Sequence, residues 1–197
     1  MTRSELKARA KAQLGGRLFG DGWLMALLAE VILAAIAGAA AGLGAGICGL
    51  LVSGPLLAGM QKLYLKQAQD GEVMKLEGLF DGFKRFGENV LLGLMEGIFV
   101  FLWSLLFVIP GIVAVYRYAL IFYIRADHPE YDWRMCFNES KRLMSGHKME
   151  LFVLHLSFLG WILVGTLTLG IGLLWVVPYM NATEAQFYRS LTASGVQ

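Results

Sequence analysis

Three long apolar blocks, separated by charged stretches, dominate the chain. The blocks cover residues 31–61, 90–124 and 151–183, and their only acidic or basic residues are Glu96 and Arg117 in the second and His155 in the third. Each block exceeds the roughly 20 residues that cross a bilayer as a helix, but falls short of the roughly 40 that two full crossings need. Because lipid offers no partner to an open backbone, each block predicts a helical hairpin with one full-length span and one shorter one.

The three hairpins follow a common register. The glycines at their turns recur at a nearly constant interval of about 60 residues, which is typical of duplicated units. We therefore predict one all-α integral membrane domain over residues 1–197, with six hydrophobic helices in three repeats at about 4–66, 73–126 and 133–191. A proline or an arginine follows each turn glycine by six positions, in the pairs Gly49 and Pro55, Gly111 and Arg117, and Gly172 and Pro178.

An amphipathic segment is expected ahead of each hairpin. The segments cover residues 4–19, 73–86 and 133–147. In the clearest one, 73–86, apolar residues recur at helical spacing while charged residues take the other positions. Helices of this kind lie flat at the lipid headgroups. The apolar positions of the clearest segment are Val73, Leu76, Leu79, Phe80, Phe83 and Phe86.

The distribution of cations predicts the orientation. Every Lys and Arg except Arg117 lies near a terminus or in a connection between hairpins, whereas the turns around Gly44, Pro110 and Gly170 carry no charge. The positive-inside rule then places the turns outside and both termini in the cytoplasm. The inner face would attract anionic headgroups, so membrane lipids are the expected partners. A net charge of +2 gives no indication of nucleic acid.

Four ionisable residues lie inside the predicted spans. Glu30, Glu96 and His155 lie in the first helix of their units, one to two turns from the inner interface, where they can snorkel or form a functional site. Arg117 stands where the other units have proline, and its permanent charge requires a partner. We expect that partner to be Glu96 or Glu30, and these three residues form the candidate polar core.

Prolines and glycines mark the expected irregularities of the helices. The helix-break candidates are Pro55, Pro110 and Pro178, where freed carbonyls either accompany a simple kink or line an ion site as in transporters; the kink is the favoured interpretation. Small residues spaced four apart predict close helix packing, either within the chain or between subunits of a homo-oligomer. They are Gly38, Gly42 and Gly46, and Gly93 and Gly97.

The chain lacks the HExxH, GxSxG and Walker patterns, so its motifs indicate no enzyme, cofactor or metal site. The leading hypothesis is a non-enzymatic membrane module: a small pore, a carrier or an accessory subunit. The alternative is a lipid-binding or membrane-shaping scaffold at the inner leaflet.

Four stretches of the second and third units form a distinctive pattern: Ile109-Pro110-Gly111, residues 117–124 (RYALIFYI), residues 139–161, and residues 170–191 with Pro178 and Tyr179. On these residues the chain resembles the domain of unknown function 975 family, uncharacterised membrane proteins found mainly in Gram-positive bacteria. The resemblance implies a bacterial cytoplasmic membrane and no particular activity. The family is distantly similar to the membrane segment of some glycerophosphodiester phosphodiesterases, which associates it with lipids.

Overall fold

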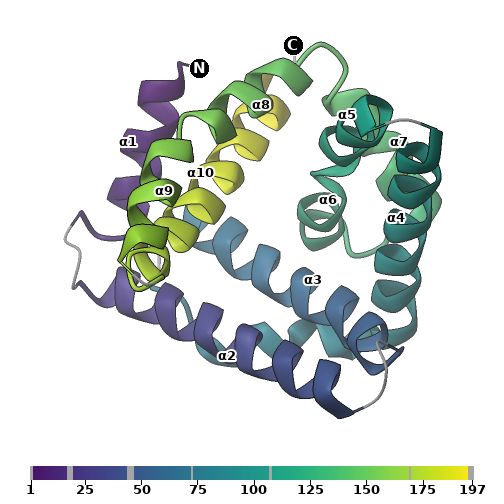
Figure 1. Ribbon diagram of the computed structural model, residues 1–197, viewed down its shortest axis with the longest axis horizontal. Helices are drawn as coiled ribbons and strands as arrows, with labels where there is room; N and C mark the ends of the chain where they lie inside the picture. Colours follow the sequence, from purple (N-terminus) through teal and green to yellow (C-terminus); the bar gives the residue numbers. More distant parts are fainter. Residues whose placement is uncertain are drawn as a thin grey trace.

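The computed structural model describes residues 2–16, 20–43, 47–71, 73–106, 108–168 and 170–194. The regular elements in these ranges are all helices, so the all-α fold class is confirmed (Figure 1). The predicted turn at Gly44 lies outside the described residues. The elements are α1 (Arg3–Gln13), α2 (Asp21–Leu43), α3 (Ile47–Asp70), η1 (Leu76–Arg85), α4 (Phe86–Leu106), α5 (Val108–Tyr118), α6 (Ile121–Asp127), α7 (Trp133–Leu143), α8 (Lys148–Leu156), α9 (Leu159–Leu167) and α10 (Leu173–Ser194).

Four helical stretches are long and apolar enough to cross a bilayer: Asp21–Ala39, Leu76–Leu105, Ile109–Asp127 and Lys148–Leu167. Helices α3 and α10 follow two of the predicted turns but are not among the four, because their C-terminal halves carry polar residues. The number of six hydrophobic helices and the threefold repeat therefore stay predictions.

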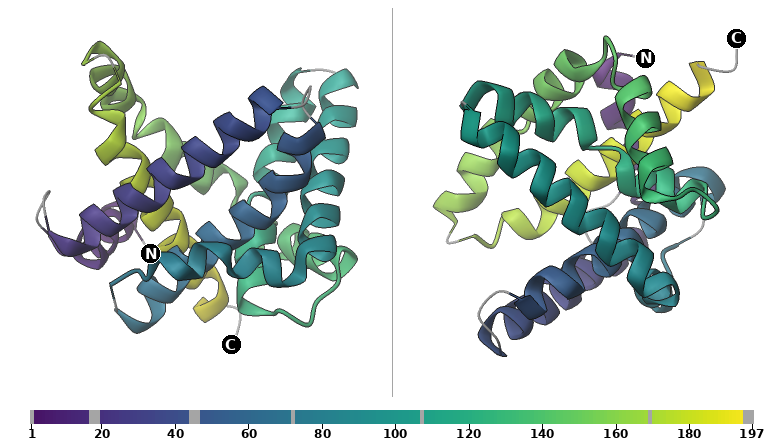
Figure 2. Two further views of the ribbon diagram at one scale, coloured as in Figure 1. Left: turned by 90° about the horizontal axis from the view of Figure 1, so that it is seen from below. Right: turned by 90° about the vertical axis from the view of Figure 1, so that its right-hand side faces the viewer.

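The helices pack as neighbouring pairs around α3 and α10. Contacts join α2 to α3, α4 to α5 and α9 to α10, and α10 also contacts α1, α2 and α3. In Figure 1, α2 and α3 run along the lower edge, α4 to α7 lie on the right, and α8 to α10 lie on the left with α1. The ends of the α4–α5 and α9–α10 pairs point to the same side of the molecule (Figure 2), away from the C-terminus.

Glycines allow α3 to pack closely against η1 and α4. A methyl group on Gly59 would overlap the carbonyl of Leu79, and one on Gly93 would lie 3.1 Å from the Cα of Gly54. Gly93 thus has the packing role predicted for it. Gly38 and Gly97 have no such contact within the described chain, since nothing described lies within 4 Å of a methyl group built on either, and an interface between subunits there stays a prediction. The surroundings of Gly42 and Gly46 lie outside the described part of the chain.

The helix-break candidates do not interrupt their helices, and a kink at Pro55 or Pro178, the favoured interpretation, stays a prediction. Helices α3 and α10 run on through Pro55 and Pro178, and Pro110 lies in the first turn of α5, where no backbone N–H is needed. The interruptions instead come at residues 119–120, between α5 and α6, and 157–158, between α8 and α9. At the second, the Ser157 hydroxyl donates to the Leu154 carbonyl, a local bond that competes with helical pairing.

Helical segments precede the hairpins, as predicted, with shifted bounds. Helix α1 begins with a capping box between Thr2 and Glu5, and α7 begins where Asp132 accepts a hydrogen bond from the Met135 amide at 2.7 Å. The 73–86 segment is the 3₁₀ helix η1 followed directly by α4, and Val73 lies before it. A position flat at the headgroups stays a prediction.

Candidate functional site

Glu30 is bound by two polar side chains from neighbouring helices. Its Oε1 accepts hydrogen bonds from the Tyr64 hydroxyl at 2.9 Å and from Asn181 Nδ2 at 2.5 Å. Tyr64, on α3, is fully buried, while Glu30 on α2 and Asn181 on α10 are half-buried. The contact therefore joins the first, second and last long helices of the chain at one carboxylate.

A second carboxylate, Glu184, lies three residues after Asn181 and so on nearly the same face of α10. Glu184 Oε1 is 2.8 Å from His155 Nε2 on α8, and His155 Nδ1 is 3.2 Å from the hydroxyl of Tyr116 on α5. The side chains of His155 and Glu184 are only 27% and 19% exposed. The imidazole is thus held between an acceptor and a hydroxyl that can either donate or accept.

Tyr123 connects the two carboxylates. Its hydroxyl donates to the Asn181 carbonyl at 3.3 Å and lies close enough to Glu30 and Glu184 to interact with both electrostatically. Tyr123 is fully buried on α6 and stacks on Tyr188 with ring centroids 5.8 Å apart. We call the whole group the interior polar cluster: Glu30, Tyr64, Tyr116, Tyr123, His155, Asn181 and Glu184.

Both helix interruptions lie beside the interior polar cluster. Tyr116 lies in the last turn of α5, just before the break at 119–120, and Tyr123 follows it on α6. His155 lies in the last turn of α8, just before the break at 157–158. Both short interruptions therefore adjoin residues of the interior polar cluster.

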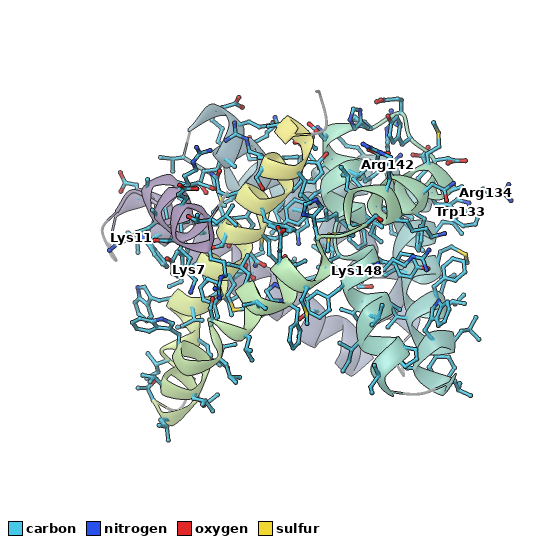
Figure 3. The ribbon with its side chains drawn as sticks, turned by 90° about the horizontal axis from the view of Figure 1, so that it is seen from above. Lys7, Lys11, Trp133, Arg134, Arg142 and Lys148 are labelled. Carbon is cyan, nitrogen blue, oxygen red and sulfur yellow. The ribbon has the colours of Figure 1, made fainter. Side chains whose placement is uncertain are left out.

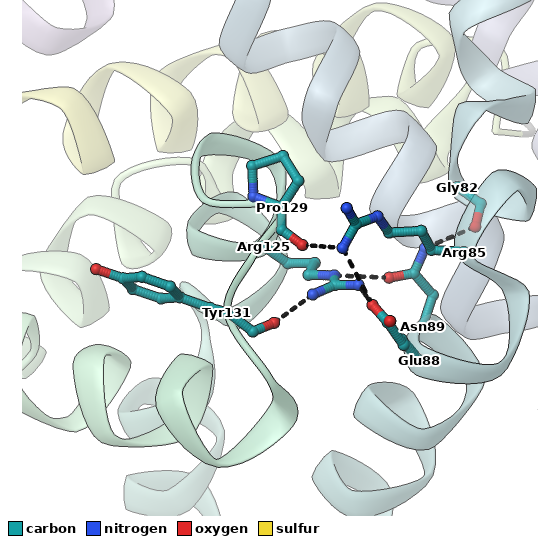
Figure 4. A network of polar contacts seen from close by, with 7 residues as sticks. All are labelled: Gly82, Arg85, Glu88, Asn89, Arg125, Pro129 and Tyr131. Carbon is teal, nitrogen blue, oxygen red and sulfur yellow. Dashed lines mark hydrogen bonds and ion pairs between the residues drawn. The ribbon is translucent and has the colours of Figure 1, made fainter.

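A separate polar network surrounds the buried Arg125 at the end of α6 (Figure 4). Arg125 Nε donates to Asn89 Oδ1 at 3.2 Å, and its terminal nitrogens bond the Tyr131 carbonyl and pair with Glu88. Asn89 in turn donates to the Gly82 carbonyl at 2.6 Å. These contacts fasten the start of α4 to the loop that joins α6 to α7.

The structure does not assemble the predicted core of Arg117, Glu30 and Glu96. No ion pair within the described residues joins Arg117 to either acid, and the Glu30 carboxylate is taken by Tyr64 and Asn181. Glu96 is half-buried on α4 and has no hydrogen bond to another described side chain. The Arg117 carbonyl accepts from the Ser140 hydroxyl at 2.9 Å, and its side chain lines a separate pocket.

Sequence reasoning singled out Glu30 and His155 but missed their partners. Asn181 and Glu184 offered a signal, since two polar residues three apart on a helix that follows an apolar block share one face. Tyr64 and Tyr123 offered none, because tyrosines are common where membrane helices meet the interface.

Cys136, on α7, is fully buried, and this burial raises its pKa to about 11. The thiol is therefore protonated at neutral pH and a weak nucleophile. Within the described ranges, no group of three or more His, Cys, Asp and Glu residues could hold a metal ion.

Comparison with known proteins gives one family. A model of the family described as "Protein of unknown function (DUF975)" matches residues 1–121 and 105–195. The match includes the N-terminal part, beyond the residues that carried the resemblance in the sequence. No curated protein and no solved structure matches the chain.

Proposed function

The chain belongs to the DUF975 family, and we propose that it is a non-enzymatic, multi-pass membrane module, a carrier or accessory subunit, whose interior polar cluster takes up and releases a proton. The observation that carries this proposal is His155, held between the Glu184 carboxylate and the Tyr116 hydroxyl. Ionisable groups inside a membrane protein are expensive to bury and mark ion or proton pathways.

The spacing of the cluster favours a proton over a larger cargo. Its neighbours are in direct contact, with donor and acceptor atoms 2.5–3.3 Å apart, which leaves no space between them for a solute. Histidine is the side chain that changes charge near neutral pH. When His155 gains a proton, both of its nitrogens donate, and the Tyr116 hydroxyl must turn from donor to acceptor.

The membrane setting rests on the four long apolar helices and on where the charges lie. In Figure 3, Arg134 and Arg142 lie in the upper part of the view and Lys7, Lys11 and Lys148 lie near its middle, whereas the ends of the α4–α5 and α9–α10 pairs point downward. This separation supports the proposed topology in a bacterial cytoplasmic membrane, with the uncharged turns outside and both termini in the cytoplasm.

Proteoliposomes test the proton proposal. Protein is reconstituted into vesicles that contain a pH-sensitive dye, and a potential that is negative inside drives protons inward. We expect these vesicles to acidify faster than empty vesicles. Glu184→Gln should slow the acidification by about tenfold or more, because a glutamine side chain cannot take up a proton as a carboxylate does. Glu139→Gln, which alters an acid on α7 outside the cluster, should match the wild type.

Two results would overturn the proposal. One is a wild-type rate equal to that of empty vesicles. The other is a Glu184→Gln rate equal to that of Glu139→Gln, with both proteins correctly folded. In either case the interior polar cluster would serve to hold the helices together.

A lipid-binding scaffold at the inner leaflet is the second candidate, favoured by a pocket of about 400 Å³ between α3 and η1, whose lining holds four lysines beside the acids Asp70, Glu77 and Asp81. Lys62 and Lys84 both reach Asp81 there, at 2.8 and 2.6 Å, and Lys66 and Lys75 complete the basic lining. Cations at this depth attract anionic headgroups. This candidate is preferred if neutralising the residues Lys84, Arg85, Lys141 and Arg142 abolishes the cellular phenotype while Glu184→Gln leaves it intact.

A further inference from the structure

We infer that the groove beside Arg117 binds one anionic phospholipid, with the phosphate at the guanidinium and an acyl chain along the surface shared by α4 and α5. The inference rests on the proposed insertion in a membrane but not on proton exchange by the interior polar cluster. It assigns a ligand to Arg117, which stands out in the sequence as a charge within an apolar block but is not part of the interior polar cluster.

The groove has the composition of a lipid-facing surface. It is a pocket of about 270 Å³, and Arg117 is the one charged residue among those that line it. Ile109 is 75% exposed, Val113 47% and Trp103 40%. Side chains this apolar and this exposed favour hydrocarbon over water as their surroundings. The remaining lining residues are Pro110 and Ala114.

The lining residues are ordered along α5 as a phospholipid would require. Ala114 lies about one helical turn before Arg117, and Pro110 lies about two turns before it, so the lining residues span about 10 Å of α5 from Arg117 toward the uncharged turn. Trp103, on α4, forms the opposite wall. A ligand that is charged at one end and apolar along its length fits this order.

The permanent positive charge of Arg117 favours an anionic ligand. Its side chain is half-buried and makes no ion pair with any acid in the described ranges. The Ser140 hydroxyl donates to the Arg117 carbonyl at 2.9 Å, which holds the Arg117 backbone against α7. A phosphate accepts paired hydrogen bonds from a guanidinium, and at the inner leaflet anionic lipids supply it.

Lipid titration followed by native mass spectrometry tests the site. Protein purified in detergent is titrated with phosphatidylglycerol and, separately, with phosphatidylcholine of the same chain length. We expect one molecule of phosphatidylglycerol to bind about tenfold more tightly than phosphatidylcholine, a preference of about 1.4 kcal/mol. Arg117→Gln should abolish this preference, because the amide cannot pair with the phosphate charge.

Two further variants make the result specific. Arg134→Gln removes an exposed cation from α7 and should keep the preference for phosphatidylglycerol. Val113→Trp fills the groove but leaves Arg117 in place, and it should weaken the binding of both lipids. The inference is overturned if wild-type protein binds both lipids equally, or if Arg117→Gln retains the preference.

The lipid measurement is independent of the proton measurement. Glu184→Gln should leave lipid binding unchanged, whereas Arg117→Gln should keep the flux that Glu184→Gln loses. A failure of one proposal is therefore distinguishable from a failure of the other.

Discussion

The Arg125 network and the interior polar cluster both bury charged side chains, but their partners differ in kind. Arg125 bonds the Tyr131 carbonyl and the Asn89 amide oxygen, groups whose protonation does not change, and pairs with the 59%-exposed Glu88. The interior polar cluster instead places carboxylates against an imidazole and phenols. The partners of Arg125 keep their protonation state, whereas the interior polar cluster consists of groups that can exchange protons, as the proposed function requires.

The two regions also differ in the distance their contacts cover along the chain. The Arg125 network joins α6 to the adjacent loop and to the start of α4, whereas Glu30 and Asn181 are 151 positions apart. We expect substitutions in the Arg125 network to change mainly the free energy of unfolding. Substitutions in the interior polar cluster should change mainly the response to pH.

The largest expected effect comes from removing Arg125. Arg125→Met should lower the free energy of unfolding by about 3 kcal/mol, because the Asn89 oxygen and the Tyr131 carbonyl would remain buried without a donor. Tryptophan fluorescence during thermal or denaturant unfolding in detergent measures the change.

The matched control is Arg134→Met, which removes an exposed arginine and should stay within about 0.5 kcal/mol of the wild type. Cys48→Ser removes the other cysteine of the chain. In that background, Arg125→Met should also speed the labelling of Cys136 by a thiol reagent, because Cys136 lines a pocket together with Arg125. Equal stability of the two arginine variants would mean that the network does not fasten the loop.

A smaller effect is expected at Glu30, where two substitutions separate hydrogen bonding from charge. Glu30→Leu leaves the Tyr64 hydroxyl and the Asn181 amide without their acceptor and should cost about 2 kcal/mol. Glu30→Gln keeps an oxygen that can accept both bonds and should cost about 0.5 kcal/mol or less. Equal losses in the two variants, by the same unfolding measurement, would show that the negative charge itself stabilises this end of the cluster.

The smallest effect is expected on the surface of α7, where Glu139 accepts two hydrogen bonds from Arg142 at 2.9 and 2.6 Å. This contact lowers the pKa of Glu139 below its ordinary value of 4.5. The stabilisation is therefore complete above that value and is lost as the pH falls through the lower, folded-state pKa. Because Arg142 is 61% exposed, solvent screens the pair, and Glu139→Gln should cost only about 0.3 kcal/mol at neutral pH.

The pH dependence of the difference between wild type and Glu139→Gln checks that prediction. The difference should be constant from neutral pH down to about 5 and shrink below it. A difference that instead grew in acid would mean that Glu139 is stabilised in its protonated form.

The sequence predicted the positions of the helices better than the contacts between their side chains. The long apolar blocks and the uncharged turns predicted where α2 and α4 lie, because a bilayer-length helix is a local property of composition. Pro55 and Pro178 leave α3 and α10 unbroken, whereas the interruptions come at residues 119–120 and 157–158. The bond from Ser157 to Leu154 that marks one of them is a detail that hydropathy does not contain.

The polar site was only half predictable for a physical reason. Glu30 and His155 stood out because charge within an apolar block is rare. Their partners, Tyr64, Asn181 and Glu184, lie in the more polar ends of α3 and α10, and which ends meet depends on the packing of helices far apart in the chain. Arg117 stood out equally, yet its guanidinium meets none of the predicted acids in the described structure.

The interruption at residues 157–158 has a mechanical consequence. Helix α9 has nine residues and is therefore about 14 Å long, and its near end is joined to α8 directly after the last turn that holds His155. It can act as a lever with its pivot at that joint. A rotation of about 10° would move the far end by about 2 Å, as simple geometry on that helix length requires. A rearrangement around one imidazole would then become a displacement at the far end of α9.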